Sequence, residues 1–261
     1  MDKLYIIKIG GNIIDDEKKL SSFLKDFALL KEKKILIHGG GKMATKLAGQ
    51  LNIPQQLVDG RRITDAETLK IVTMTYAGYI NKTIVAQLQS NSCNAFGLSG
   101  ADGNLIKAHK RIHADLDYGF VGDIDEINTG LLQMLLHQDL IPVIAPISHN
   151  KEGQLLNTNA DTIAQEIAKA LSGMFQVHLI YSFEKNGVLK NADDDNSVIK
   201  EINAASYKEL KQKQIVFAGM IPKLDNAFAA LNSGVKKVII GKAEQLKEII
   251  EGKSGTSIVN E

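Results

Sequence analysis

The stretch IIKIGGN, from Ile6 to Asn12, places a lysine inside an apolar run and two glycines directly behind it. The apolar residues predict a strand, and Lys8 lies on the same face of that strand as Ile6. A cation in a strand buried on both faces is costly unless it meets an anion, or unless its stem lies along the sheet and its amine reaches water. Gly10 and Gly11 let backbone N–H groups approach phosphate or carboxylate oxygens, because no Cβ stands in the way. The stretch therefore favours a strand that ends at an anion-binding site.

The rest of the chain alternates short apolar runs with amphipathic stretches. A second strand, KILIHGGG (34–41), also ends in glycines, and the box Thr64-x-x-Glu67 predicts the start of a long helix towards Gln89. Residues 105–125 are typical of a β-hairpin. Strands that alternate with helices predict an α/β chain with a mainly parallel sheet covered on both faces, which binds ligands outside the carboxyl ends of its strands.

The alternation restarts after residue 173, with the apolar run QVHLIYSF (176–183). This restart predicts two lobes, residues 1–174 and 175–261.

Composition excludes several classes of protein. The chain has 261 residues, and 31 basic against 30 acidic residues give a formal net charge of +1, so no nucleic-acid or membrane partner is expected. A single cysteine, Cys93, excludes an internal disulfide and fits a reducing compartment. No signal peptide or membrane-spanning run is evident, so we expect a cytoplasmic protein.

The glycines of the second strand do not form a P-loop. The Walker pattern needs glycine where Leu36 stands and serine or threonine where Met43 stands. The relaxed dinucleotide fingerprint does fit Gly39–Ala44, and Asp59 follows 20 residues after Gly39, where a ribose-binding acid is expected. The segment between them has little room for the strand that would present this acid, and Lys8 stays unexplained. A non-catalytic dinucleotide-binding module is therefore a weaker alternative.

Other polar residues also break local rules. Lys223 falls in the first turn of a predicted helix, where the helix dipole disfavours a cation, so it is a candidate to compensate the charge of a ligand. Asn157, Asn159 and Asp161 stand at another helix start, where they either cap the helix or orient ligand groups. Arg62 offers a rigid fork suited to a carboxylate.

No metal ligand is evident in the sequence. His109 and His113 have the spacing of a zinc-binding helix, but Lys110 stands where that motif has glutamate and the segment is a predicted hairpin.

Seven motifs together resemble those of the amino acid kinase family. They occur in the family's order between Ile6 and Lys223, and they read IIKIGG, HGGG, DGRRIT, GLSGADG, VGDID, LNTNAD and GMIPK. The combination is most similar to the branch that acts on N-acetyl-L-glutamate. The resemblance implies a three-layer αβα sandwich with a mainly parallel central sheet. It also implies that the γ-phosphoryl group of ATP, entering with Mg²⁺, is transferred to the side-chain carboxylate of N-acetyl-L-glutamate, a step of arginine biosynthesis.

The resemblance also implies roles for individual residues. Two lysines, Lys8 and Lys223, would stabilise negative charge on the transferring phosphoryl group and the leaving ADP, and Asp161 would hold both in place. The residues implied for the amino acid are Gly40, Gly41, Arg62, Asn157 and, as support for that pocket, Asn159. The residues implied for the nucleotide are Gly10, Gly11, Ser182, Gly187 and Phe217.

Two departures from the family's pattern concern the nucleotide side. The turn YSFEKNGVL lacks the aspartate that the family commonly carries, and Ala218 stands where glycine is usual. The resemblance further implies a homodimer built through residues 1–174, which would bind the amino acid, with residues 175–261 binding ATP. An acyl cap other than acetyl, such as succinyl, stays open, as does another carboxylate or carbamate as substrate.

Overall fold

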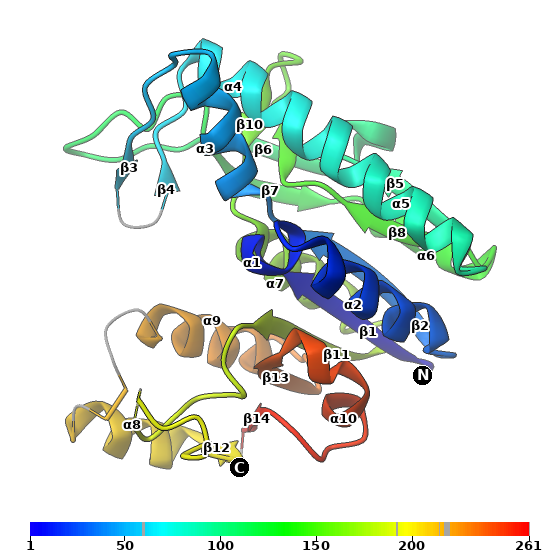
Figure 1. Cartoon of the computed structure of the whole chain (residues 1–261), viewed down its shortest axis with the longest axis vertical. Coiled ribbons are helices and arrows are strands. Elements are labelled where there is room, and N and C mark those ends of the chain that lie inside the picture. The colour runs from blue at the N-terminus through cyan, green and yellow to red at the C-terminus, as the bar shows by residue number, and fades with distance from the viewer. Residues whose placement is uncertain (59–60, 192, 214, 217–219, 261) are drawn as a thin grey trace.

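The computed structural model describes residues 1–58, 61–191, 193–213, 215–216 and 220–260. Figure 1 shows a central sheet that runs through the molecule with helices on both of its faces. The helices are α1 (Gly11–Ile14), α2 (Glu17–Leu29), α3 (Gly41–Gln50), α4 (Ala66–Thr73), α5 (Asn81–Ser90), α6 (Thr129–His137), α7 (Ala160–Leu171), α8 (Ala204–Gln212), α9 (Ile221–Asn232) and α10 (Leu246–Ile250). The strands are β1 (Lys3–Ile9), β2 (Lys33–His38), β3 (Leu57–Val58), β4 (Arg61–Arg62), β5 (Ala95–Leu98), β6 (Ile106–Lys110), β7 (Gly122–Ile127), β8 (Ile141–Ile144), β9 (Ile147–His149), β10 (Leu155–Asn157), β11 (Gln176–Phe183), β12 (Glu201–Ile202), β13 (Lys237–Lys242) and β14 (Thr256–Ile258).

The large sheet has the strand order β12-β14-β13-β11-β1-β2-β8-β5 in the described part of the chain. Its neighbouring strands pair in parallel, except β13 and β14, which pair antiparallel. This arrangement confirms the prediction of an αβα sandwich with a mainly parallel sheet. The sheet does not stop at the predicted boundary between the lobes, since β1 and β11 are hydrogen-bonded along their length.

Strand β1 lies at the middle of this sheet and is buried on both faces. Leu4 and Ile6 belong to a core formed with α6, α7, α8 and α9, whereas Tyr5, Ile7 and Ile9 belong to a second core with α2, α4, α5 and α10. The period-2 alternation of side chains produces this division. Lys8 therefore projects from the face that α7 and α9 cover.

The predicted hairpin at 105–125 is present as the antiparallel pair β6–β7, which joins β9 and β10 in a separate four-stranded sheet. The predicted long helix is also present, but Asp65 rather than Thr64 caps it, because the Asp65 carboxylate accepts the N–H of Thr68 at 2.7 Å. This helix continues from α4 through a π-helical segment, Met74–Ile80, into α5. No helix among the described residues is long and apolar enough to cross a membrane.

Candidate active site

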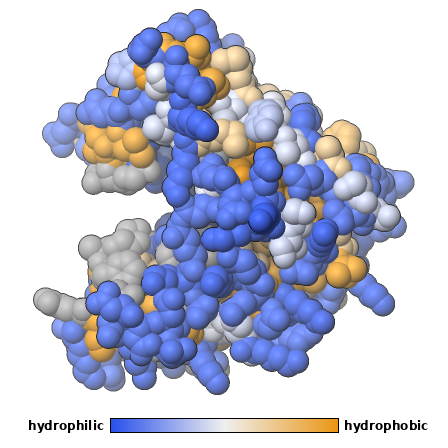
Figure 2. Space-filling model, in the orientation of Figure 1, coloured by the Kyte–Doolittle hydropathy of each residue, from blue (hydrophilic) through white to orange (hydrophobic). Residues whose placement is uncertain are grey.

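Two adjoining pockets lie at the carboxyl ends of β1 and β2, as predicted for ligands of a parallel sheet. Figure 2 shows the molecule hollowed between the β3–β4 hairpin and the N-terminal end of α9, on the left of the view. The first pocket is lined by Lys8, Gly10, Gly11, Gly39, Gly40, Gly41, Leu57, Arg61, Arg62, Tyr76, Val121, Pro146, Asn157, Thr158, Asn159, Ala160 and Asp161. The second pocket shares part of this lining and adds Asn12, Ile13, Lys42, Thr45, Ser182, Glu184 and Lys223.

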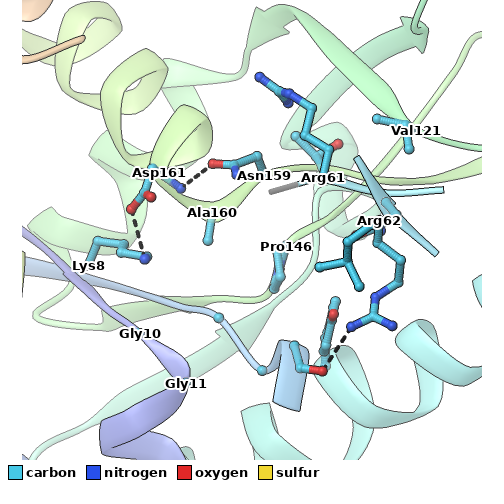
Figure 3. A pocket seen from close by; sticks show the side chains of 17 residues that line it. Lys8, Gly10, Gly11, Arg61, Arg62, Val121, Pro146, Asn159, Ala160 and Asp161 are labelled. Atoms are coloured by element: carbon cyan, nitrogen blue, oxygen red, sulfur yellow. Dashed lines mark hydrogen bonds and ion pairs between the residues drawn. The ribbon is translucent and has the colours of Figure 1, made fainter. Parts of the chain in front are cut away.

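A cluster of two lysines and one carboxylate lies where the pockets meet. Lys8 Nζ lies 2.8 Å from Asp161 Oδ1, and Lys223 Nζ lies 4.0 Å from Asp161 Oδ2. Figure 3 shows Lys8 reaching from β1 to the first turn of α7, beside the loop that carries Gly10 and Gly11. The two ammonium groups and one carboxylate leave a net charge of +1 at this point, which suits an anionic ligand.

The protonation state of this cluster follows from its surroundings. Burial by itself raises the pKa of the Asp161 carboxyl, but the charges of Lys8 and Lys223 outweigh burial and lower it overall. Burial also lowers the pKa of Lys223, which Asp161 raises and Lys8 lowers further. Asp161 is therefore ionised at neutral pH and can hold both ammonium groups by charge.

Asn159 positions Asp161 by capping α7. Its side-chain oxygen accepts the N–H groups of Asp161 at 2.8 Å and Thr162 at 3.1 Å. The capping interpretation is thus confirmed, and Asn159 also lines the first pocket. The cap places Asp161 in the first turn of the helix, where the helix dipole favours a negative charge.

The glycines after β1 and β2 bring the two strand ends together. The Gly39 N–H donates to the Ile9 carbonyl at 3.0 Å. Gly40 has a φ of +157°, and a Cβ at this position would overlap Ile80 and lie 2.9 Å from Tyr76 Cδ1. A side chain here would displace the turn, so Gly40 needs to be glycine for steric reasons as well as for its backbone conformation.

Arg62 and Asn157 line the first pocket from β4 and β10. Arg62 is only 7% exposed, and its Nη2 donates to the Gly41 carbonyl and to Thr45 Oγ1, both at 2.9 Å. Its Nη1 donates to the side chain of Gln55. These bonds hold the guanidinium against the glycine turn. Asn157 donates its amide to the hydroxyl of Thr64 at 3.0 Å.

Only some of the residues predicted to bind the nucleotide line the pockets. Gly10 and Gly11 line both pockets, and Ser182, which is 5% exposed, lines the second. The Ser182 hydroxyl has no hydrogen-bond partner among the described residues, which leaves it available to a ligand oxygen. Gly187 instead packs against β14, where a Cβ would lie 2.6 Å from Thr256 Oγ1, and it lines neither pocket. Phe217 lies outside the described residues.

Two other residues weighed from the sequence, Asp59 and Ala218, also lie outside the described residues.

Several lining residues were missed by sequence reasoning. Lys42 and Glu184 line the second pocket, and Lys42 donates a hydrogen bond to the side chain of Asn12. A cation in the first turn of a helix directly after a glycine turn was a usable signal for Lys42, because the same rule singled out Lys223. Arg61 and Tyr76 line the first pocket, and no local pattern points to Tyr76.

Between them, the pockets can accept two anionic groups, with Lys8 lining both pockets and Lys223 lining the second. Backbone N–H groups, Arg62 and the two lysines supply donors, whereas the described residues include no cluster of three or more His, Cys, Asp or Glu suited to a metal ion. Such a site stabilises negative charge by position.

The chain is similar to several known proteins. The model of the amino acid kinase family matches residues 3–242. Acetylglutamate kinase of Cytophaga hutchinsonii is 58% identical over 262 residues, 99% of this chain and 99% of that protein. Acetylglutamate kinase of Parabacteroides distasonis is 54% identical and covers 95% of this chain and 97% of its own. Among solved structures, the protein smu.665 of Streptococcus mutans UA159 superposes with a TM-score of 0.81 at 27% identity, over 99% of both chains.

Proposed function

The chain belongs to the amino acid kinase family, and from this we propose that it transfers the γ-phosphoryl group of ATP to the side-chain carboxylate of N-acetyl-L-glutamate. The products are ADP and an acyl phosphate, and the step serves arginine biosynthesis. ATP enters as its Mg²⁺ complex, so the metal belongs to the substrate.

The observation that carries the proposal is the convergence of Lys8 and Lys223 on Asp161. The two lysines come from β1 and α9, and both lie within 4.0 Å of one carboxylate at the junction of two pockets. A module that only binds a nucleotide has no need of two cations between two pockets. A phosphoryl group in transit between two substrates does need them.

The reaction requires charge compensation more than acid–base chemistry. A substrate carboxylate is already ionised at neutral pH, so no general base has to remove a proton before it attacks phosphorus. One carboxylate oxygen forms a bond to the γ-phosphorus as the bond to the bridging oxygen of ADP breaks. Lys8 and Lys223 stabilise the negative charge of the phosphoryl oxygens and of the leaving ADP, and Asp161 holds the two lysine side chains in position.

The pocket linings suggest how the substrates divide the site. Every residue that lines the first pocket belongs to 1–174, and this pocket would take the N-acyl amino acid through Arg62, Asn157 and the N–H groups of Gly40 and Gly41. The second pocket adds residues from 175–261, and its four cationic side chains, Lys8, Lys42, Arg62 and Lys223, face a single lining acid, Glu184. This balance supports its assignment to the phosphates of ATP.

The dinucleotide-binding alternative is not favoured. In that fold the strand after the glycine-rich turn and its helix would extend the central sheet and present an acid to a ribose. Here the strand after α3 is β3, which in the described part of the chain pairs with β4 in a separate two-stranded hairpin.

We also propose a homodimer built through residues 1–174. Strand β5 ends the large sheet, and Phe96 on it is 45% exposed, so this edge could pair with the same strand of a second copy. Light scattering should give twice the mass of one chain, and Phe96→Asp should shift the distribution towards the monomer. A monomeric wild-type protein would contradict this assembly.

One assay tests the proposed activity. ADP release is measured with hydroxylamine present to trap an acyl phosphate, in parallel with N-acetyl-L-glutamate, N-succinyl-L-glutamate, glutamate and aspartate. We expect hydroxamate with N-acetyl-L-glutamate, and about 100-fold less of it or lower from a Lys8→Met variant, which controls for contaminating kinases. Hydroxamate with only the succinyl compound would reassign the acyl cap, and ADP release without any hydroxamate would reject acyl phosphate formation.

A further inference from the structure

A buried polar network lies directly beneath the glycine turn that follows β2. His38 and Asn81 are both 0% exposed. His38 Nδ1 lies 2.8 Å from the Gly39 carbonyl oxygen, and His38 Nε2 lies 3.2 Å from Asn81 Nδ2. Asn81 Nδ2 also donates to the Val143 carbonyl at 2.9 Å. The network links the ends of β2 and β8 to the first residue of α5.

The partners determine which atom carries each proton. The Gly39 carbonyl only accepts, so Nδ1 of His38 bears the proton and Nε2 accepts from the Asn81 amide. That amide donates its two protons to His38 and Val143, while its oxygen accepts from Lys82 Nζ at 3.2 Å. If the imidazole were protonated, its Nε2–H and the Asn81 N–H would be two donors facing each other in a buried site. Burial, aided by the charge of Lys82 and opposed by the Gly39 bond, accordingly lowers the pKa of His38 to about 4.

The same stretch of the long helix contacts the turn from a second direction. Tyr76 and Ile80, in the π-helical segment, pack where a Cβ of Gly40 would stand. The next residues, Asn81 and Lys82, pack their side chains against Gly97 of β5, where an added Cβ would lie 2.8 Å from Lys82 Nζ. Packing and hydrogen bonds from adjacent residues thus hold one turn, and a π-helical insertion in a long helix often marks a functional segment.

The backbone groups of the turn show what this support achieves. Gly39 donates its N–H to Ile9, the Gly40 carbonyl accepts the N–H of Ala44 at 3.1 Å, and the Gly41 carbonyl accepts from Arg62. Among the described residues, the N–H groups of Gly40 and Gly41 have no protein acceptor. They begin α3 and line the first pocket, so they are available to an anionic ligand.

We propose that Asn81, acting through His38, is a positioning residue that orients the Gly39–Gly40 peptide so that the N–H group of Gly40 points, beside that of Gly41, at the carboxylate of the amino-acid substrate. The inference rests on the proposed function only in naming that substrate. Asn81 itself lines neither pocket. Losing it should weaken binding of the amino acid and leave the ATP side unchanged.

The primary test is the KM for each substrate in Asn81→Ala. A misdirected hydrogen bond to a charged group weakens binding about 10-fold, so we expect the KM for N-acetyl-L-glutamate to rise by about this factor. The KM for ATP should change less than about twofold, because its donors lie elsewhere. Asn91→Ala is the control, since Asn91 follows the last residue of α5 and its side-chain amide donates to the Gln87 carbonyl of the same helix, away from the glycine turn. It should leave both KM values unchanged.

Two substitutions of His38 separate the halves of the network. His38→Asn keeps an amide donor near the Nδ1 position and loses the link to Asn81, whereas His38→Gln reaches Asn81 and loses the Gly39 contact. We expect the KM for the amino acid to rise more in His38→Gln than in His38→Asn. The ¹⁵N shifts of the imidazole in the wild-type protein at neutral pH should report a proton on Nδ1, whether or not any variant folds.

Each outcome has a distinct meaning. A wild-type protein that does not phosphorylate N-acetyl-L-glutamate rejects the proposed function, and its imidazole spectrum still tests the network. An active wild type whose Asn81 and His38 variants keep both KM values, or raise both equally, overturns the positioning role. A proton found on Nε2 in the wild-type spectrum overturns it as well, because Asn81 could then not donate to His38.

Discussion

Replacing Asp161 by asparagine should lower kcat about 100-fold and leave the KM for ATP unchanged or smaller, a loss of about 2.7 kcal/mol in transition-state stabilisation. Asp161 holds Lys8 at 2.8 Å and Lys223 at 4.0 Å. Asparagine keeps the size of the side chain and removes its charge. The cluster of two ammonium groups and one carboxylate, with net charge +1, then becomes a repelling pair with net charge +2.

The magnitude follows from what the carboxylate does for the lysines. Without it, the two ammonium groups repel each other and lose the carboxylate that holds them, and a misplacement of about 1 Å at a reacting centre can cost about 100-fold in rate. The added positive charge attracts the phosphates of ATP, so ground-state binding does not weaken. A fall in kcat without a rise in the KM for ATP is the signature of an interaction that matters in the transition state.

The assay is steady-state ADP release with saturating N-acetyl-L-glutamate and varied ATP. Glu166→Gln is the matched control, because Glu166 lies on the same helix, is 28% exposed against 24% for Asp161, and forms its own ion pair with Lys169 at 2.9 Å. We expect near wild-type kinetics from this control. If Asp161→Asn kept kcat within about threefold of wild type, or lost activity only through a higher KM for ATP, the assigned role of the carboxylate would be wrong.

Three further outcomes are expected. Lys8→Ala should lower kcat by about 100-fold or more with little change in the KM for N-acetyl-L-glutamate, and a variant altered only in that KM would contradict the role of Lys8. Arg62→Lys should raise the KM for the amino acid about 10-fold, because lysine cannot replace the bonds to Gly41 and Thr45 and still grip a carboxylate; a change confined to the KM for ATP would move Arg62 to the other substrate. The free energy of unfolding should fall by up to about 3 kcal/mol from His38 alone as the pH drops from 6.5 to about 4, because the folded protein disfavours the imidazolium and the unfolded chain binds the proton. Urea unfolding across this range should show a shallower fall in His38→Asn, and parallel curves would count against a buried neutral histidine.

Features encoded by neighbouring residues could be predicted from the sequence. The alternation in β1 gives both of its buried faces, and Asn159 caps α7 as its residue type predicts. Glycines at the ends of β1 and β2 do lie at the ligand end of the sheet. Such features depend on burial and on hydrogen bonds between residues close in the sequence. Hydrophobic periodicity and capping preferences therefore predict them.

Contacts between distant segments could not be predicted in this way. Thr64 and Asp65 are both good caps, and Thr64 is instead engaged with the carbonyl of Arg62. Nothing near Tyr76 or Asn81 in the sequence shows that they support the glycine turn, since that depends on how the long helix packs across β2 and β8.

The chain thus marks Lys8 and Lys223 as residues that break local rules and Asp161 as an acid at a helix start, and this much the sequence determines by itself. Their meeting is decided only by the tertiary structure. Strand β1 lies between β2 and β11 in the sheet, and α7 and α9 cover the face from which Lys8 projects. Strand order and helix placement are set because both apolar faces of the sheet must be buried at once by helices from the whole chain. No short stretch of sequence therefore predicts them.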